Sequence, residues 1–103
     1  MTMLERDLAT IVEHLLDLFG WTWKHDEPAV RQSGTWATAF RGARGFPDYV
    51  AVRDGRLVFA EIKNERGRIS TAQHDWLDQL RKTSAEVYVW RPNDVEEMKR
   101  VLR

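Results

Sequence analysis

The sequence contains no cysteine, which excludes disulfide bonds and thiolate metal sites. It also has no apolar run near the roughly 18 residues that a membrane-spanning helix requires. The first ten residues are acidic and amphipathic, unlike the basic and then apolar start of a secretion signal. These three absences predict a cytoplasmic protein that does not associate with membranes.

Acidic and basic residues are unevenly distributed along the chain, although the formal net charge is zero. Residues 1–30 carry six acidic and two basic residues, whereas residues 41–68 carry seven basic and four acidic residues. A basic middle favours a protein that meets an anion on one face, while a mixed solvated surface would have the same composition. The 103 residues suit a single domain, residues 1–103, whose small core would gain from homodimer formation.

Apolar residues at helical spacing predict an amphipathic helix over residues 3–19. Thr2 and Glu5 form a capping-box pattern at its start, and Gly20 ends it. The same periodicity predicts two further helices, over residues 70–82 and 95–102.

Between the helices the sequence favours β-strands. Residues 21–25 and 86–90 are typical of short strands, residues 35–40 of a strand or sheet edge, and residues 26–34 of a loop. Helix, strands, helix, strand and helix in this order indicate an α/β fold with a mixed β-sheet flanked by helices.

Asp54 and Gly55 stand between two β-rich runs and are a strong signal for a two-residue hairpin turn. Such a turn fixes which residues face each other across the two strands. Because side chains alternate between the faces of a strand, Asp48, Glu61 and Lys63 are predicted to share one face. The predicted pairs are Arg53 with Arg56, Val52 with Leu57, Val50 with Phe59 and Asp48 with Glu61.

This pairing sets two carboxylates opposite each other at the open end of the hairpin. Directly opposed side chains have Cβ atoms roughly 4.5–5.5 Å apart, and like charges at that separation repel. A raised pKa, a nearby cation such as Lys63, or a bound metal ion would relieve the repulsion. Two carboxylates and the Ile62 carbonyl suit Mg²⁺ or Mn²⁺, with waters and substrate phosphate as the remaining ligands. Without a metal, Glu61 and Lys63 would form an ordinary salt bridge at a polar strand end.

The same residues carry a family resemblance. Pro47-Asp48 followed by Glu61-Ile62-Lys63 resembles the PD-(D/E)xK nuclease signature. The surrounding sequence, GFPDYVAVRDGRLVFAEIKNERGRISTAQHDWLDQL and then AEVYVWRP, closely resembles the VRR-NUC (virus-type replication-repair nuclease) family in its small stand-alone form. The resemblance covers residues 45–92 and extends over the first helix. It implies a restriction-endonuclease-like fold and divalent-metal cleavage of DNA.

The resemblance also implies roles for single residues. Asp48 and Glu61 would bind the metal, Lys63 would be the catalytic lysine, and Gln73 would be a further active-site residue. Gln73 has a second interpretation, because Ser70 and Gln73 form a capping-box pattern at the start of the predicted helix.

An acidic residue of the first helix is also implied to lie near the metal. The alignment favours Glu5, with Asp7 and Glu13 as rivals. Small stand-alone members of the family resemble Holliday-junction resolvases, tend to be homodimers and often come from phages. The implied setting is therefore the cytoplasm of a bacterium or of a phage-infected host cell.

Two arginine-rich loops flank the predicted metal site, one before the hairpin and one after it. Arginines in such loops would hold the DNA backbone without reading the base sequence. We therefore expect a metal-dependent, structure-selective DNA endonuclease, acting on branched DNA such as Holliday junctions. A flap or single-strand-end nuclease and a non-catalytic DNA-binding module are the alternatives. The expected phosphate contacts are Arg41, Arg44, Arg66 and Arg68.

Overall fold

The structure is a computed structural model that describes residues 3–26, 29–30, 36–37 and 40–103. Within these residues the chain forms three α-helices: α1 (Glu5–Leu18), α2 (Thr71–Arg81) and α3 (Val95–Leu102). A short 3-10 turn, η1 (Pro92–Asp94), precedes α3. In the part of the chain described, no helix has the length and hydropathy to cross a membrane. The strands are β1 (Thr22–Lys24), β2 (Ala29–Val30), β3 (Trp36–Ala37), β4 (Tyr49–Arg53), β5 (Arg56–Ile62) and β6 (Glu86–Trp90).

The main sheet has four strands in the order β1-β4-β5-β6. The β1–β4 and β4–β5 pairs are antiparallel, and the β5–β6 pair is parallel, so the predicted mixed α/β sheet is confirmed. Helix α2 makes the crossover between the two parallel strands, as such a connection requires. The prediction of a loop over residues 26–34 is wrong in part, because β2 within it pairs with β3 in a separate two-stranded sheet.

The hairpin forms as predicted, with a two-residue turn between β4 and β5. Asp54 has φ 51° and Gly55 has φ 79°, and positive values at both positions define a type I′ turn. Arg53 faces Arg56, and the register continues to Tyr49 opposite Ala60. Asp48 and Glu61 follow at the next position, where the ladder ends.

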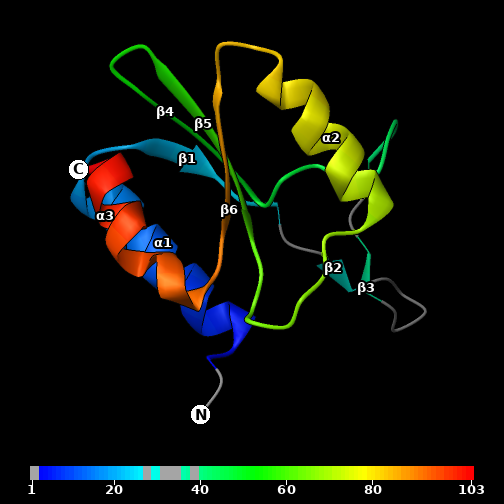
Figure 1. Ribbon diagram of the computed structural model, residues 1–103, viewed down its shortest axis with the longest axis horizontal. Helices are drawn as coiled ribbons and strands as arrows, with labels where there is room; N and C mark the ends of the chain where they lie inside the picture. The colour runs from blue at the N-terminus through cyan, green and yellow to red at the C-terminus, as the bar shows by residue number, and fades with distance from the viewer. Residues whose placement is uncertain (1–2, 27–28, 31–35, 38–39) are drawn as a thin grey trace.

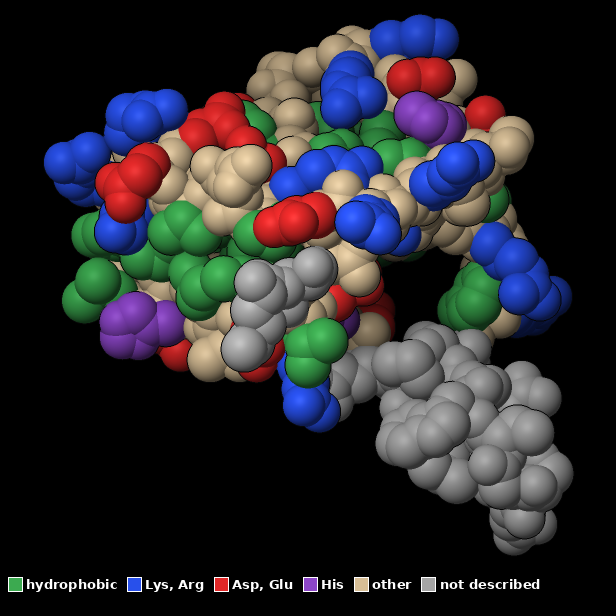
Figure 2. All heavy atoms as spheres, turned by 60° about the horizontal axis from the view of Figure 1, so that its bottom comes forward, with side chains coloured by type: hydrophobic (Ala, Val, Ile, Leu, Met, Phe, Trp, Pro, Cys, Tyr) green, Lys and Arg blue, Asp and Glu red, His purple; other side chains and the backbone are tan. Residues whose placement is uncertain are grey.

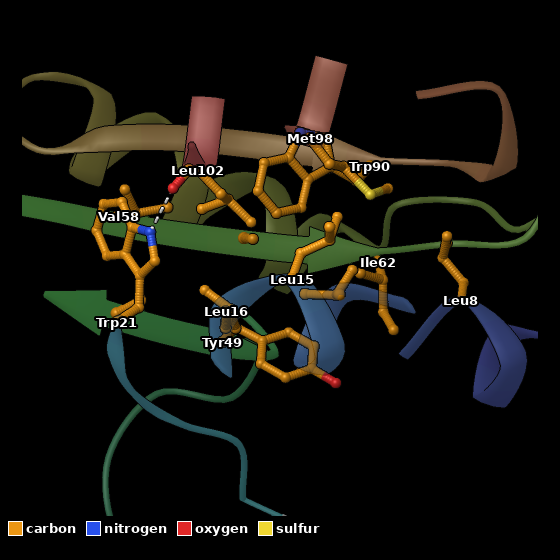
Figure 3. Packing of buried hydrophobic residues seen from close by; sticks show 13 residues of the cluster. Leu8, Leu15, Leu16, Trp21, Tyr49, Val58, Ile62, Trp90, Met98 and Leu102 are labelled. Atoms are coloured by element: carbon orange, nitrogen blue, oxygen red, sulfur yellow. Dashed lines mark hydrogen bonds between the residues drawn. The ribbon is translucent and has the colours of Figure 1, made fainter. Parts of the chain in front are cut away.

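One face of the sheet packs against α1 and α3 (Figure 1). Val58, Ala60 and Ile62 alternate along β5 on this face and are each 2% exposed or less. They pack with apolar residues of both helices, and Figure 3 shows the Trp21 indole donating a hydrogen bond to the Leu102 carbonyl at 2.8 Å. The predicted apolar stripes of α1 and α3 therefore form the main core, as the helical spacing indicated.

The start of α1 differs from the prediction. The helix begins at Glu5, and its N-cap residue Leu4 makes no side-chain capping bond. Thr2, the predicted cap, lies outside the described residues. The end of the helix is as predicted, because Gly20 follows the C-cap with φ 77°, a conformation that glycine adopts at little cost.

The other face of the sheet carries Phe59 and Glu61 and is covered by α2. The loop before β4 packs against the first turns of this helix. The Phe46 ring meets Phe59 and Trp76 edge-on, at centroid distances of 5.8 and 5.0 Å. A Cβ placed on Gly45 would lie 2.5 Å from the Ala72 carbonyl carbon, so only glycine permits this approach. Gly45 thereby fixes where the chain enters β4, three residues before Asp48.

Replacing Gly45 with alanine tests this approach. Gly42 is a matched control, because its φ is 103° and that of Gly45 is 94°, but a Cβ on Gly42 would meet nothing within 4 Å. Both alanine variants carry the strain of positive φ, and only Gly45→Ala adds a clash with helix backbone. We expect Gly45→Ala to lower the free energy of unfolding by about 1–3 kcal/mol more than Gly42→Ala, measured in urea. Equal losses would contradict the contact between the loop and α2.

Candidate metal and phosphate site

The structure brings four of the predicted site residues together at the open end of the hairpin. Asp48 lies directly before β4, Glu61 near the end of β5, Lys63 just beyond it, and Gln73 in the first turn of α2. Gln73 Nε2 donates to Glu61 Oε2 at 2.9 Å, and Lys63 Nζ lies 3.9 Å from the same oxygen. Four residues separated by up to 25 positions in the sequence thus share one site.

Glu61 is the buried centre of this group, with 2% of its surface exposed. Burial, which disfavours the charged carboxylate, is the largest cause that raises its pKa, to about 8. The negative charge of Asp48 raises the pKa further, while the Lys63 ammonium lowers it. The predicted opposition of two carboxylates is therefore present, and Lys63 offsets it only in part.

One oxygen of this carboxyl group has no protein donor. Glu61 Oε2 receives the Gln73 amide, but Oε1 is buried without a hydrogen-bond partner. A buried carboxylate oxygen that lacks a donor is unfavourable unless it holds a proton or binds a cation. Its surroundings supply a second acid, Asp48, and this combination suits a cation better than a neutral ligand.

The two interpretations of Gln73 hold together. Ser70 Oγ accepts from the Gln73 N–H at 3.1 Å, and Gln73 Oε1 accepts from the Ser70 N–H at 2.9 Å. This capping box holds one side of the Gln73 amide group, so that its Nε2 is presented to Glu61. The helix cap thus orients the side chain that contacts the site.

The Ile62 carbonyl is a third oxygen that can be directed to the same site, and Pro47 leaves it without a backbone donor. The Ile62 N–H donates to Asp48 Oδ2 at 2.8 Å. In an antiparallel ladder the N–H and C=O of one residue point to the same partner strand. The Ile62 carbonyl is therefore directed to the edge where Asp48 lies, and the register, continued by two residues, sets Pro47 opposite it. Proline has no N–H to donate to that carbonyl.

These three oxygen donors fit a hard divalent cation. Within the described part of the chain no group of three or more His, Asp or Glu side chains gathers to hold a metal. A cation here would therefore be held by the Asp48 and Glu61 carboxylates and the Ile62 carbonyl, with waters or phosphate oxygens as further ligands. Mg²⁺ is commonly bound in this way, by one or two carboxylates together with substrate.

The loop that carries Lys63 is held by Arg91, a residue that the sequence did not identify. Arg91 donates to the carbonyls of Asn64 and Gly67 at 2.8 and 2.7 Å. Gly67 lies against the aliphatic part of Lys63, since a Cβ there would be 3.2 Å from Lys63 Cδ. Lys63 is thereby confined, with 16% of its side chain exposed. No local pattern marks Arg91, because its partners are 24 and 27 residues earlier.

The first-helix acids are not joined to this group. Glu5 and Asp7 are exposed in the first turn of α1, and no hydrogen bond or ion pair among the described residues connects them to Asp48 or Glu61. The nearest link is indirect, because Leu8 packs in the same cluster as Ile62 (Figure 3). Glu13 is engaged elsewhere, accepting from the Tyr49 hydroxyl at 2.6 Å.

The predicted arginines are exposed and come from loops next to the site. Arg41 and Arg44 line a pocket that also includes Asp48. Arg66 and Arg68 lie in the loop between β5 and α2, directly after Lys63. Figure 2 shows a face of the molecule on which several basic side chains are exposed. Their exposure leaves the guanidinium groups available to an anion, and it is equally typical of solvated loops.

Comparisons with protein-family models, with curated proteins and with solved structures found no match to this chain. The resemblance to VRR-NUC nucleases therefore stays a prediction from the motifs.

The pKa of Glu61 predicts a pH-dependent stability. Between its ordinary value of 4.5 and about 8, the folded state holds a proton that the unfolded state has lost. Stability must then fall as pH rises through this window, with a slope approaching about 1.4 kcal/mol per pH unit. Glu61→Gln removes the titrating group, so its free energy of unfolding is expected to decline less over the same window.

Urea unfolding in EDTA at several pH values between about 5 and 9 measures this difference. Glu96→Gln, which changes an exposed glutamate of α3, is the control and should follow the wild-type profile. Parallel profiles for wild type and Glu61→Gln would show that Glu61 does not hold the proton.

Proposed function

We propose that this protein is a metal-dependent, structure-selective DNA endonuclease with a restriction-endonuclease-like fold, related to the VRR-NUC family. One feature supports this function above the others: a buried glutamate, Glu61, lacks a donor for one oxygen and lies beside a second carboxylate, Asp48. A non-catalytic DNA-binding module has no use for such a pair, because it lowers stability and is too buried to contact DNA phosphates.

Asp48, Glu61 and the Ile62 carbonyl would hold Mg²⁺ or Mn²⁺. When bound, the ion would lower the pKa of a water and stabilise negative charge on the phosphate. Phosphodiester hydrolysis forms a bond from the water oxygen to phosphorus and breaks the bond to one ester oxygen. The water gives a proton to solvent, and the leaving oxygen takes one from solvent to become a hydroxyl.

The chain's own residues arrange the rest of the reaction. The Lys63 ammonium lies 3.9 Å from Glu61, close enough to stabilise negative charge that develops on the attacking water or the phosphate. Gln73 holds one oxygen of Glu61 and leaves the other for the cation. Arg91 acts at a distance as a positioning residue, by holding the loop that confines Lys63.

Arg41, Arg44, Arg66 and Arg68 are the proposed contacts to the DNA backbone. Arg41 and Arg44 lie in the loop before β4 and line a pocket with Asp48, and Arg66 and Arg68 lie in the loop that follows β5 directly after Lys63. Contacts to phosphate position a duplex without reading its sequence, which is why selectivity is expected to depend on DNA shape. A homodimer would present two such sites to the two strands of a branched substrate.

A cleavage assay on labelled four-way junction, flap, single-stranded and linear duplex DNA tests this function. We expect cutting with Mg²⁺ or Mn²⁺ and none in EDTA. Lys63→Ala should slow cutting by about 10²–10³-fold, because a charged group beside the reacting phosphate is lost. Lys99→Ala is the matched control, since Lys99 lies on α3 and pairs with Glu96, and it should cut as wild type does.

The substrates separate the possible activities. Paired symmetric cuts in the junction would identify a resolvase, and cuts confined to flaps or free ends would keep the chemistry and exclude junction resolution. Equal rates for Lys63→Ala and Lys99→Ala would exclude the proposed role of Lys63. If no DNA is cut with either metal, the chain alone is not an endonuclease.

Calorimetric titration with Mg²⁺ or Mn²⁺ tests the cation site separately from cleavage. Because the carboxyl pair holds a proton near neutral pH, binding should release it, and the heat should vary with the ionisation enthalpy of the buffer. Asp48→Asn should weaken binding at least tenfold, whereas Asp78→Asn on the exposed surface of α2 should not. Equal affinities for the wild type and Asp48→Asn would place the metal elsewhere.

A further inference from the structure

A pocket with a volume of about 350 Å³ opens beside Asp48. This volume falls in the range of sites that hold small organic groups. Three aromatic side chains, Phe40, Phe46 and Trp76, line it, together with Arg41 and Arg44. The roles proposed above require none of the rings, so their presence in this pocket has no explanation in the hydrolytic site alone.

Two of the three rings, Phe40 and Phe46, are exposed, and Phe46 and Trp76 are held against each other. Phe40 is 53% exposed and Phe46 is 46% exposed, which is unfavourable for large apolar side chains that lie close together. Phe46 is fixed edge-on against Trp76, with an interplanar angle of 86°. The Trp76 indole in turn donates to the Ala43 carbonyl at 3.3 Å. The part of the aromatic surface formed by Phe46 and Trp76 is therefore in place without a ligand.

The charges around the rings match a nucleotide. Arg41 and Arg44 supply positive charge for a phosphate backbone. Asp26 lines the same pocket and can accept hydrogen bonds from the amino groups of a base, although it also pairs with Lys24 at 3.1 Å. Aromatic rings stack on any base, because every base has a π-face. Asp48 joins this pocket to the carboxylate pair.

We propose that this aromatic pocket binds an unpaired nucleobase of the DNA strand that is cut. The inference rests on the proposed nuclease function and names its substrate class: DNA with an unpaired nucleotide next to the phosphate at the carboxylate pair. A base inside a duplex is stacked and cannot reach the rings, so a fully paired strand would first have to extrude it.

Binding of fluorescent oligonucleotides in EDTA tests this proposal without cleavage. The two probes are a single-stranded oligonucleotide and a strand of equal length and charge made of abasic units. Stacking of a base on aromatic rings contributes about 1–3 kcal/mol, so the wild type should bind the base-bearing strand roughly 5- to 150-fold more tightly. Equal affinity for the two probes would overturn the proposal.

Phe40→Ala locates the effect in the pocket. Phe40 is half exposed, so its replacement spares the core, and it should reduce the preference for bases while leaving abasic binding unchanged. Trp76→Leu, a second variant, should reduce it as well. Leu18→Ala is the control, because Leu18 is 62% exposed on α1 and lies outside this pocket. A preference for bases that survives both pocket variants would place stacking elsewhere and overturn the proposal.

The two functions fail in different ways. Metal-dependent cutting without a preference for bases would leave the nuclease and exclude the base pocket. A preference for bases that requires Phe40, in a chain that cuts no DNA, would keep the pocket and exclude the nuclease. Where the wild type cuts, Phe40→Ala should also slow cutting of a single-base bulge but not of the same bulge made abasic.

Discussion

The repulsion between the Asp48 and Glu61 carboxylates is the constraint on which the arrangement of the site depends. When both are ionised, two such charges about 5 Å apart repel by about 3 kcal/mol at an effective dielectric constant of roughly 20, and the raised pKa of Glu61 is one result. The hairpin register prevents them from separating along the strands, and the burial of Glu61 keeps water from screening them. Each polar neighbour of the pair can be understood as a response to this charge. The Ile62 N–H and the Gln73 amide each donate to one of the acids.

These neighbours do not fully compensate the negative charge of the pair, and what is still lacking is positive charge or a hydrogen-bond donor. Both donors, together with the ammonium of Lys63, face the pair, yet one Glu61 oxygen has no partner and the pKa of Glu61 stays raised. Sites that must bind a cation lose stability without it, and the rest of the fold has to supply that stability. Here the sheet face packed on α1 and α3 does so, since Val58, Ala60 and Ile62 of β5 are all buried on that face. The α2 face has fewer buried apolar residues and carries the polar site.

The parts that the sequence could predict are those with local causes. Asp54 and Gly55 determine a type I′ turn, and the turn determines every pair along the hairpin, up to the meeting of the two acids. The cap formed by Ser70 and Gln73 likewise depends on residues three apart. Helix periodicity predicted the faces of α1 and α3 for the same reason.

The parts that could not be predicted depend on contacts between distant segments. Arg91 follows β6 and donates to carbonyls in the loop that precedes α2. No spacing rule connects residues so far apart in the sequence. Gly45 looked like an ordinary loop glycine, although it permits the loop to touch the helix backbone at Ala72. The family resemblance predicted an acidic residue of the first helix near the proposed metal. Glu5 lies in that helix, α1, but makes no hydrogen bond or ion pair with the described residues of the site. Its place depends on how the helix end is oriented, which the sequence does not encode locally.

The topology explains why the carboxylate pair, the proposed cation site, and the aromatic pocket occupy one edge of the sheet. Strand β5 ends at the carboxylate pair, and α2 begins there before it returns the chain to β6. The loop before β4 reaches the same edge, because the hairpin places its entry beside the exit of β5. Gly45 lets that loop approach the backbone of α2, and Phe46, two residues before Asp48, meets Trp76 of this helix. In the proposed complex, a DNA strand with its phosphate at Asp48 would present the neighbouring base to these rings, and only an unpaired base has a free face to offer them.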